Sequence, residues 1–488
     1  MLFNSHVFIF AFLPATLLGY FLLGARGYPR VAALWLTAAS LFFYAWWNPH
    51  YLAIVGGSIV FNYALGVCIS KAGGAQRLRL ARGLLALGAC GNLGLLAYYK
   101  YAGFFVENAS WLLGTHWHWI TVALPLGVSF FTFTQIAYLV DAYHGVTREY
   151  DFLYYALFVT FFPHLIAGPI VLYRNLMPQF ARPETYRFHA ENLAGGITLF
   201  ILGLAKKVII ADQLSTLAGG VFDGVAHGQT PALAASWIGV LAYTLQLYFD
   251  FSGYSDMAIG LGRMFNVRFP LNFDSPYQAR DIIDFWRRWH ITLSTFLRDH
   301  VYIPLGGNRY GGARRYLNLF LTMLLGGLWH GAAWTFVVWG GLHGIYLVVN
   351  RGWLRLIDGR AWAQAPLARL GGRILTLLAV IVGWVFFRAG TIPHAIVLLR
   401  GMAGQSGWHG LIPGKRDELL LLLFAGALAL FAPNTQALLR QAQFAKGERD
   451  PARALWRWNY GTATATALLF VLSVLYLSHN SEFLYFQF

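Results

Sequence analysis

Two histidines lie in a stretch of the chain that contains no Asp, Glu, Lys or Arg. His330, followed by Gly331, stands about midway along residues 317–350, and His343 lies in the second half of the same stretch. An ionisable side chain inside such an apolar run is expensive to bury and is therefore a functional candidate. A neutral imidazole is suited to take a proton from a hydroxyl group. The sequence therefore predicts that His330 is a general base.

The second histidine is expected to have a structural role. If residues 317–350 formed one continuous helix, His330 and His343 would lie about 220° apart around its axis, so a shared metal site is not expected. His343 sits among glycines, which favours a packed or hydrogen-bonded side chain. His116 and His118 alternate in an aromatic loop, a pattern more typical of an interfacial belt than of a metal site.

A further histidine belongs to the cationic stretch that precedes this run. Residues 281–298 are predicted to form one short helix, with His290 at the border of its apolar face, one turn from Trp286 and from Ser294. We expect this polar-edged helix to lie against a membrane or inside a protein funnel and not across a bilayer. The apolar face would consist of Ile282, Trp286, Trp289, Leu293, Phe296 and Leu297.

Three arginines of this stretch are candidates for phosphate binding. Arg287, Arg288 and Arg298 lie mostly off the apolar face. The guanidinium fork matches the geometry of phosphate oxygens. Contact with lipid headgroups on the cytoplasmic side would explain the same arginines equally well. Both interpretations stay open at the level of sequence.

Other polar side chains interrupt apolar stretches in the middle of the chain. His164 lies between two prolines, which should break a membrane span there. Lys206 and Lys207 end an apolar segment and are expected to extend to the membrane interface. Residues 246–256 combine two carboxylates with serines beside an apolar run. This pattern indicates either the polar wall of an internal cavity or a helix end with its capping residues.

Composition places the chain among integral membrane proteins. Of its 488 residues, 58% are hydrophobic and only 11% are charged, with a mean hydropathy of +0.53. The formal charge of +16 does not indicate nucleic-acid binding, because the basic residues are scattered between apolar spans. They fit basic loops on the cytoplasmic side of a membrane. The only cysteines, Cys68 and Cys90, are expected to be small buried hydrophobes.

The apolar stretches predict about 13 membrane crossings, some of them tilted or re-entrant. The basic loops alternate so that both termini are expected outside the cytoplasm, with residues 280–315 inside. The predicted spans are residues 6–24, 31–47, 51–69, 83–99, 121–140, 152–172, 192–210, 231–249, 317–350 as a hairpin, 374–387, 419–431 and 463–477.

Four motifs in this order resemble the membrane-bound O-acyltransferase family. They are Pro-His around His164, Tyr-Phe-Asp-Phe-Ser-Gly-Tyr-Ser-Asp at residues 248–256, Phe-Trp-Arg-Arg-Trp-His ending at His290, and Gly-Gly-Leu-Trp-His-Gly around His330. The resemblance is densest over residues 124–344. Within the family, the chain is most similar to the branch that acetylates exported bacterial polysaccharides.

The resemblance implies an all-α polytopic membrane fold. Family members form a ring of tilted helices around a funnel, here with about 11–13 transmembrane and re-entrant helices. Residues 1–488 would make one domain, with core motifs at 124–344, C-terminal spans at 374–477 and a periplasmic tail at 478–488. The location would be the bacterial inner membrane.

The resemblance also implies an activity and its participants. His330 matches the family's catalytic histidine and His290 its second functional position. Acetyl-CoA would be the donor substrate, bound by Arg287, Arg288, Arg298 and Trp286, with no tightly bound cofactor and no metal. The acceptor would be a hydroxyl group of an exported glycan, such as alginate or cellulose, or of a periplasmic partner that completes the transfer. A transporter or flippase is the alternative, although the sequence shows no repeated half.

Overall fold

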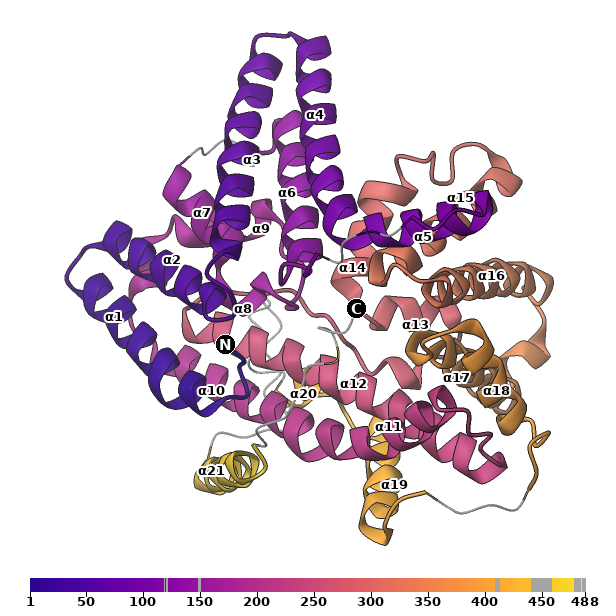
Figure 1. Ribbon diagram of the computed structural model, residues 1–488. Coiled ribbons are helices and arrows are strands. Elements are labelled where there is room, and N and C mark those ends of the chain that lie inside the picture. The colour runs from indigo at the N-terminus through magenta and orange to yellow at the C-terminus, as the bar shows by residue number, and fades with distance from the viewer. Residues whose placement is uncertain are drawn as a thin grey trace. The chain divides into compact units, whose positions relative to one another are not determined.

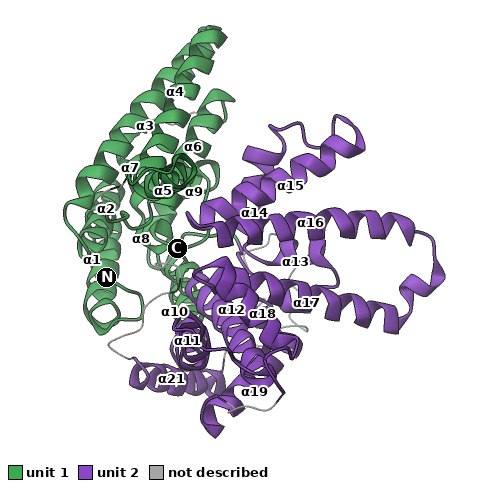
Figure 2. Cartoon of the chain, turned by 45° about the vertical axis from the view of Figure 1, so that its right-hand side comes forward, with its two compact units in different colours: residues 1–200, 256–270 green, residues 201–255, 271–488 purple. Residues whose placement is uncertain are grey.

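The structure, a computed structural model, is helical in all its regular elements over the residues it describes (Figure 1). These are residues 1–117, 119, 122–147, 151–408, 413–439, 459–477 and 484. The all-α membrane fold predicted from the sequence is confirmed. The chain divides into two compact units, one of Met1–Phe200 with Asp256–Pro270 and one of Ile201–Ser255 with Leu271–Phe488 (Figure 2). The single domain expected over residues 1–488 stays a prediction.

The first unit contains the N-terminal helices and the end of one long helix. Its elements are η1 (Phe8–Phe12), α1 (Leu13–Ala25), α2 (Pro29–Ala45), α3 (Tyr51–Gly74), α4 (Leu78–Leu96), η2 (Ala97–Tyr101), α5 (Ala102–Leu113), α6 (Val128–Tyr143), α7 (Phe152–Thr160), α8 (Phe162–Leu165), α9 (Tyr173–Phe180), η3 (Pro183–Tyr186) and most of α10 (Ala190–Ala205).

The second unit contains the stretch with the candidate catalytic histidines. Its elements are η4 (Lys206–Ala211), α11 (Asp212–Ala226), most of α12 (Leu233–Met264), η5 (Pro276–Gln278), α13 (Ile282–Arg288), α14 (Ile291–Leu297), η6 (Arg298–Tyr302), α15 (Gly311–His330), α16 (Trp334–Leu356), η7 (Ala361–Gln364), α17 (Pro366–Arg388), α18 (Ile392–Met402), α19 (Arg416–Phe431), α20 (Thr435–Leu438) and α21 (Tyr460–Leu475).

In the part of the chain that the structure describes, five helical stretches are long and apolar enough to cross a membrane. They are Phe8–Ala25, Tyr51–Gly74, Leu78–Leu113, Ala190–Ala226 and Pro366–Arg388. The remaining predicted spans do not meet both conditions, since α12, α15 and α16 are long enough but not apolar enough, and the others are shorter or broken. The break expected around His164 is confirmed, because α7 ends at Thr160 and only the four-residue α8 follows before α9.

The two cysteines contradict one expectation. Cys68 on α3 and Cys90 on α4 are both exposed at the protein surface, and neither forms a disulfide. The predicted burial was wrong because an apolar helix surface facing lipid has the same composition as one facing protein. An apolar neighbourhood in the sequence therefore does not show which of the two surfaces a side chain occupies.

A ladder of buried side-chain hydrogen bonds joins four helices of the first unit. Asn62 on α3 and Asn92 on α4 exchange amide hydrogen bonds of 3.1 and 2.6 Å. Gln135 on α6 donates to Ser58 on α3 at 2.7 Å and accepts from the hydroxyl of Tyr155 on α7 at 2.7 Å. Helices in lipid lack a hydrophobic driving force toward one another, so such contacts hold them together.

We expect Gln135→Leu to destabilise the first unit by about 1–3 kcal/mol, because the hydroxyl groups of Ser58 and Tyr155 then lose a buried partner. Thermal unfolding in detergent measures the change. Ile136→Leu, at a half-buried position on the same helix, is the control. Adding Tyr155→Phe to Gln135→Leu should restore part of the loss. If the double variant were no more stable than the single one, the hydrogen bond between these two side chains would not be the source of the stability.

Candidate active site

The predicted helix over residues 281–298 is two helices with His290 between them. α13 ends at Arg288, α14 begins at Ile291, and His290 has the left-handed backbone angles φ 43° and ψ 55°. The prediction of one continuous helix was therefore wrong. The position of His290 also differs from the border position we expected, because its side chain is fully buried at 0% exposure.

The cause of this break is Asn272, a buried residue far away in the sequence. The Asn272 carbonyl accepts from the Ile291 backbone N–H at 3.0 Å, and its side-chain oxygen accepts from the Thr292 hydroxyl at 2.9 Å. His290 Nδ1 lies 2.9 Å from the same side-chain oxygen. Because the amide oxygen of Asn272 is an acceptor, His290 carries its proton on Nδ1. A single asparagine thus redirects the backbone and sets the orientation of the imidazole.

His330 is the last residue of α15, at the turn of a helical hairpin. Residues 331–333 connect α15 to α16, so the hairpin predicted over residues 317–350 is confirmed (Figure 1). The two helices approach closely at glycines: a Cβ at Gly327 would lie 2.3 Å from the Phe336 carbonyl, and one at Gly340 would lie 2.5 Å from the Met323 carbonyl. The backbone of α16 therefore fills the space beside Gly327.

Aromatic rings surround the His330 imidazole. The ring of Trp339 on α16 stands perpendicular to it, with centroids 5.2 Å apart, and the ring of Phe387 on α17 lies 5.2 Å away. Trp329 precedes it at 4.9 Å. His330 itself is 7% exposed. The candidate base therefore lies in an almost closed apolar setting, where an acyl group and a hydroxyl would be separated from bulk water.

His343 also contacts the ring of Trp339. Its ring lies 4.9 Å from that of Trp339, and its Nδ1 accepts a 3.3 Å hydrogen bond from Nε1 of Trp286 on α13. The packed, hydrogen-bonded state expected for His343 is what the structure shows. The angular separation from His330 does not apply, since the turn at residues 331–333 ends the helix. Among the described residues, no group of three His, Cys, Asp or Glu side chains is arranged to hold a metal ion.

The three candidate arginines differ in how they are held. Arg288 pairs with Asp284 at 2.9 Å, and Arg298 pairs with Asp299 at 2.7 Å. Arg287 is exposed and forms no ion pair with any described residue. Burial alone would raise the pKa of Asp284, but the hydrogen bond from Arg288 and the backbone N–H of Arg280 lower it. Arg287 is thus the arginine of the three that a phosphate can reach without displacing a carboxylate.

A buried ion-pair cluster in the second unit corrects two expectations. Lys207 Nζ lies 2.6 Å from a carboxylate oxygen of Asp212 and 2.6 Å from one of Asp250, and its side chain is only 3% exposed. Lys207 therefore does not extend to an interface. Asp250 lies in the middle of α12, which rules out a helix end at residues 246–256. The apolar run between residues 192 and 210 signalled that Lys207 was unusual, but not which carboxylates it would meet.

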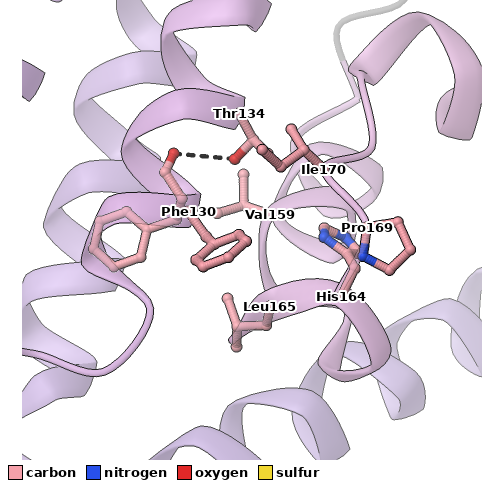
Figure 3. A pocket seen from close by; sticks show the side chains of 8 residues that line it. Phe130, Thr134, Val159, His164, Leu165, Pro169 and Ile170 are labelled. Atoms are coloured by element: carbon pink, nitrogen blue, oxygen red, sulfur yellow. Dashed lines mark hydrogen bonds between the residues drawn. The ribbon is translucent and has the colours of Figure 1, made fainter. Parts of the chain in front are cut away.

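His164 belongs to the first unit. It lines a small pocket opposite Phe130, next to Pro169 (Figure 3). Its Nε2 is 2.9 Å from the Phe158 carbonyl, and its ring packs on Phe269. Asp256 is also buried in that unit. These contacts make His164 part of the packing where the prolines break the span.

Several residues of this site were not singled out from the sequence. They are Asn272, Trp339 and Gly383, and each acts through a contact with a residue outside its own helix or loop. Asn272 lies two residues after Pro270 in the segment between α12 and η5, and nothing in that segment indicates its partners. Trp339 and Gly383 lie in apolar helices, where their residue types are common.

Comparison with known proteins places most of the chain in one family. Residues 81–387 match the model of MBOAT, the membrane-bound O-acyltransferase family. A peptidoglycan O-acetyltransferase of Helicobacter pylori is 44% identical over 83% of this chain and 80% of its own. A probable alginate O-acetylase of Pseudomonas putida is 40% identical over the whole of both chains. A teichoic acid D-alanyltransferase of Bacillus subtilis is 27% identical over 54% of this chain and 66% of its own.

The burial of His290 has a consequence for stability in acid. Two helices of seven residues flank it, and both are too short to span a bilayer. Burial lowers the pKa of His290 to about 3. In the unfolded chain a histidine has a pKa of about 6.5, so between about pH 6.5 and 3 the unfolded state binds more protons. The stability due to neutral His290 is complete above pH 6.5 and is lost as the pH falls.

We therefore expect the thermal midpoint of the protein to fall between pH 7 and pH 5, with His290 contributing at most about 1.4 kcal/mol per pH unit. His290→Gln should reduce this dependence, whereas His227→Gln, at an exposed position, should not change it. Thermal unfolding at a series of pH values measures both. An equally steep decline in the His290→Gln protein would mean that other groups cause the acid sensitivity.

Proposed function

Because the chain belongs to the membrane-bound O-acyltransferase family, we propose that it moves an acetyl group from acetyl-CoA on the cytoplasmic side to an exported polysaccharide. The protein is an acyltransferase with several membrane helices. The observation that supports the proposed reaction most directly is the position of His330, at a buried turn lined by aromatic rings within the matched residues. We place the protein in the bacterial inner membrane with both termini in the periplasm.

The proposed mechanism assigns the proton transfers to His330. The neutral imidazole takes the proton of the acceptor hydroxyl while the hydroxyl oxygen attacks the acetyl carbonyl carbon. A C–O bond forms, the C–S bond to coenzyme A breaks, and the departing sulfur takes the proton back from the imidazolium. A positioned base of this kind accelerates transfer by typically ~10²–10⁴-fold. His290, whose proton is held on Nδ1 by Asn272, has the secondary role of orienting the thioester or a water molecule.

The donor is held at its charged end by arginine. Coenzyme A carries phosphate groups, and a guanidinium with no carboxylate partner can bind them at little electrostatic cost. Arg287 fits this role better than Arg288 or Arg298, which are paired with Asp284 and Asp299. Trp286 was also a candidate for the donor site. Its buried side chain donates to His343, so we assign it to holding the site together.

The acceptor is an exported glycan, reached directly or through a periplasmic protein that completes the transfer. One relative is named for alginate and another for peptidoglycan. For this chain we propose an exopolysaccharide such as alginate or cellulose. The aromatic tail at residues 485–488, a candidate anchor for the partner, lies outside the described residues. Leu484, just before it, is buried, and its backbone hydrogen-bonds to the Asp250 carboxylate.

We predict that His330→Ala lowers acetyl transfer by at least ~10²-fold, since the general base is lost. Binding of acetyl-CoA should remain, because the base acts on the acceptor. His290→Ala should have a smaller effect, and His227→Ala, at an exposed position, should have none. Release of the free thiol from acetyl-CoA, with the polymer and any periplasmic partner present, measures the rate. Near-normal transfer by His330→Ala would end this mechanism, and no thioester turnover by the wild type would favour the transporter instead.

The arginines give a separate prediction. Arg287→Gln should weaken acetyl-CoA binding roughly two- to fivefold, as expected for an exposed charge pair, and high salt should reduce the difference. Arg288→Gln should mainly lower thermal stability, because it removes the partner of Asp284. Calorimetric titration and thermal unfolding of both variants separate these effects. Unchanged affinity in Arg287→Gln would assign this arginine to lipid contact or to topology.

A further inference from the structure

Two N–H groups beside His330 have no hydrogen-bond acceptor among the described residues. They are Nε1 of Trp339 and Nε2 of His343, and both atoms are buried from solvent. The two side chains are one helical turn apart on α16, and their ring centroids are 4.9 Å apart. Buried polar groups without a partner are rare in folded proteins. Such a pair points to an acceptor that the described chain does not itself supply.

The hydrogen bond from Trp286 shows that the His343 nitrogen is a donor. An indole N–H can only donate, so His343 Nδ1 accepts the 3.3 Å bond from Trp286 and carries no proton. A neutral imidazole then carries its proton on Nε2. His343 Nε2 and Trp339 Nε1 are therefore both donors, and neither can satisfy the other.

Both donors face the same point on the neighbouring helix. A Cβ at Gly383 on α17 would lie 2.9 Å from His343 Nε2 and 3.5 Å from Trp339 Nε1. Because residue 383 is glycine, the two nitrogens face backbone where any other residue would place a side chain. Because Gly383 has no side chain, no Cβ blocks the two donors where they face α17.

We propose that Trp339 and His343 together bind one uncharged acceptor oxygen. An oxygen with two lone pairs can accept from both donors, as water and a carbonyl group do. The rings around the pair, which include those of Phe285, Trp384 and Phe387, carry no charge that would favour an anion. The site adjoins the candidate base, because the Trp339 ring stands 5.2 Å from that of His330.

The oxygen has two possible sources with the same chemistry. One is an ordered water molecule, which would link α16 to α17. The other is the carbonyl oxygen of the acyl group held next to His330, which the two donors would orient and polarise. The second source rests on the proposed function, whereas the first does not.

The decisive variant is Trp339→Phe, which keeps an aromatic ring opposite His330 and removes the N–H. Trp353→Phe is the matched control, because Trp353 lies on the same helix and is 50% exposed. The dissociation constants of acetyl-CoA and of coenzyme A are measured for the full-length protein in detergent. If the acyl carbonyl is the acceptor, the preference for acetyl-CoA should fall roughly five- to tenfold in Trp339→Phe and stay unchanged in Trp353→Phe. Looser packing alone would affect both ligands alike.

The second measurement is a high-resolution experimental structure of the ligand-free protein. If water is the acceptor, density for one oxygen should lie about 2.7–3.2 Å from both nitrogens, and Gly383→Ala should expel it. An unchanged preference for acetyl-CoA together with no such density would overturn the inference. If the wild type did not bind acetyl-CoA, the proposed function would be wrong. The presence or absence of density for an oxygen between the two nitrogens would then test this site by itself.

Discussion

The backbones of α15 and α16 touch at two glycines, and the arrangement around His330 depends on that contact. With Gly327 and Gly340 against backbone carbonyls of the facing helix, the hairpin has no room for side chains at either position. Trp339 therefore stands close enough to turn its ring perpendicular to the imidazole of His330. His343, one turn further along α16, also contacts Trp339 and lies within hydrogen-bonding reach of Trp286 from α13. One steric contact thus aligns side chains from three helices.

Polar groups inside the second unit are held by partners from distant parts of the chain. Asn272 bonds to the backbone and side chains of residues 290–292, and Lys207 bridges Asp212 and Asp250. Each of these groups would be expensive to bury alone in apolar surroundings. Because these polar groups have their hydrogen-bond and ion-pair partners, they restrict the helices to one register. The site around His330 contrasts with them, because its buried donors include two for which the described chain supplies no acceptor.

The sequence predicted the helical class and a hairpin with His330 near its middle, because these follow from local composition. A charge-free run with one histidine at its middle is visible without any knowledge of tertiary contacts. The break at His290 was not predictable, since its cause, Asn272, lies 18 residues earlier and acts through space. The angle between His330 and His343 was calculated for one continuous helix, and it does not apply because the chain turns at residues 331–333. The predicted burial of Cys68 and Cys90 was wrong, because lipid-facing and protein-facing helix surfaces favour the same side chains.

The reciprocal amide bonds between Asn62 and Asn92 have a consequence for how the protein is made. α3 and the stretch that begins with α4 are both long and apolar enough to cross a membrane, and each carries one of these amides. A lone amide in the hydrocarbon core would be poorly solvated, whereas two that bond to each other are not. We expect the pair to leave the translocation channel together as a preformed hairpin. The helices of the first unit that follow α4 would then assemble against a hairpin that is already formed.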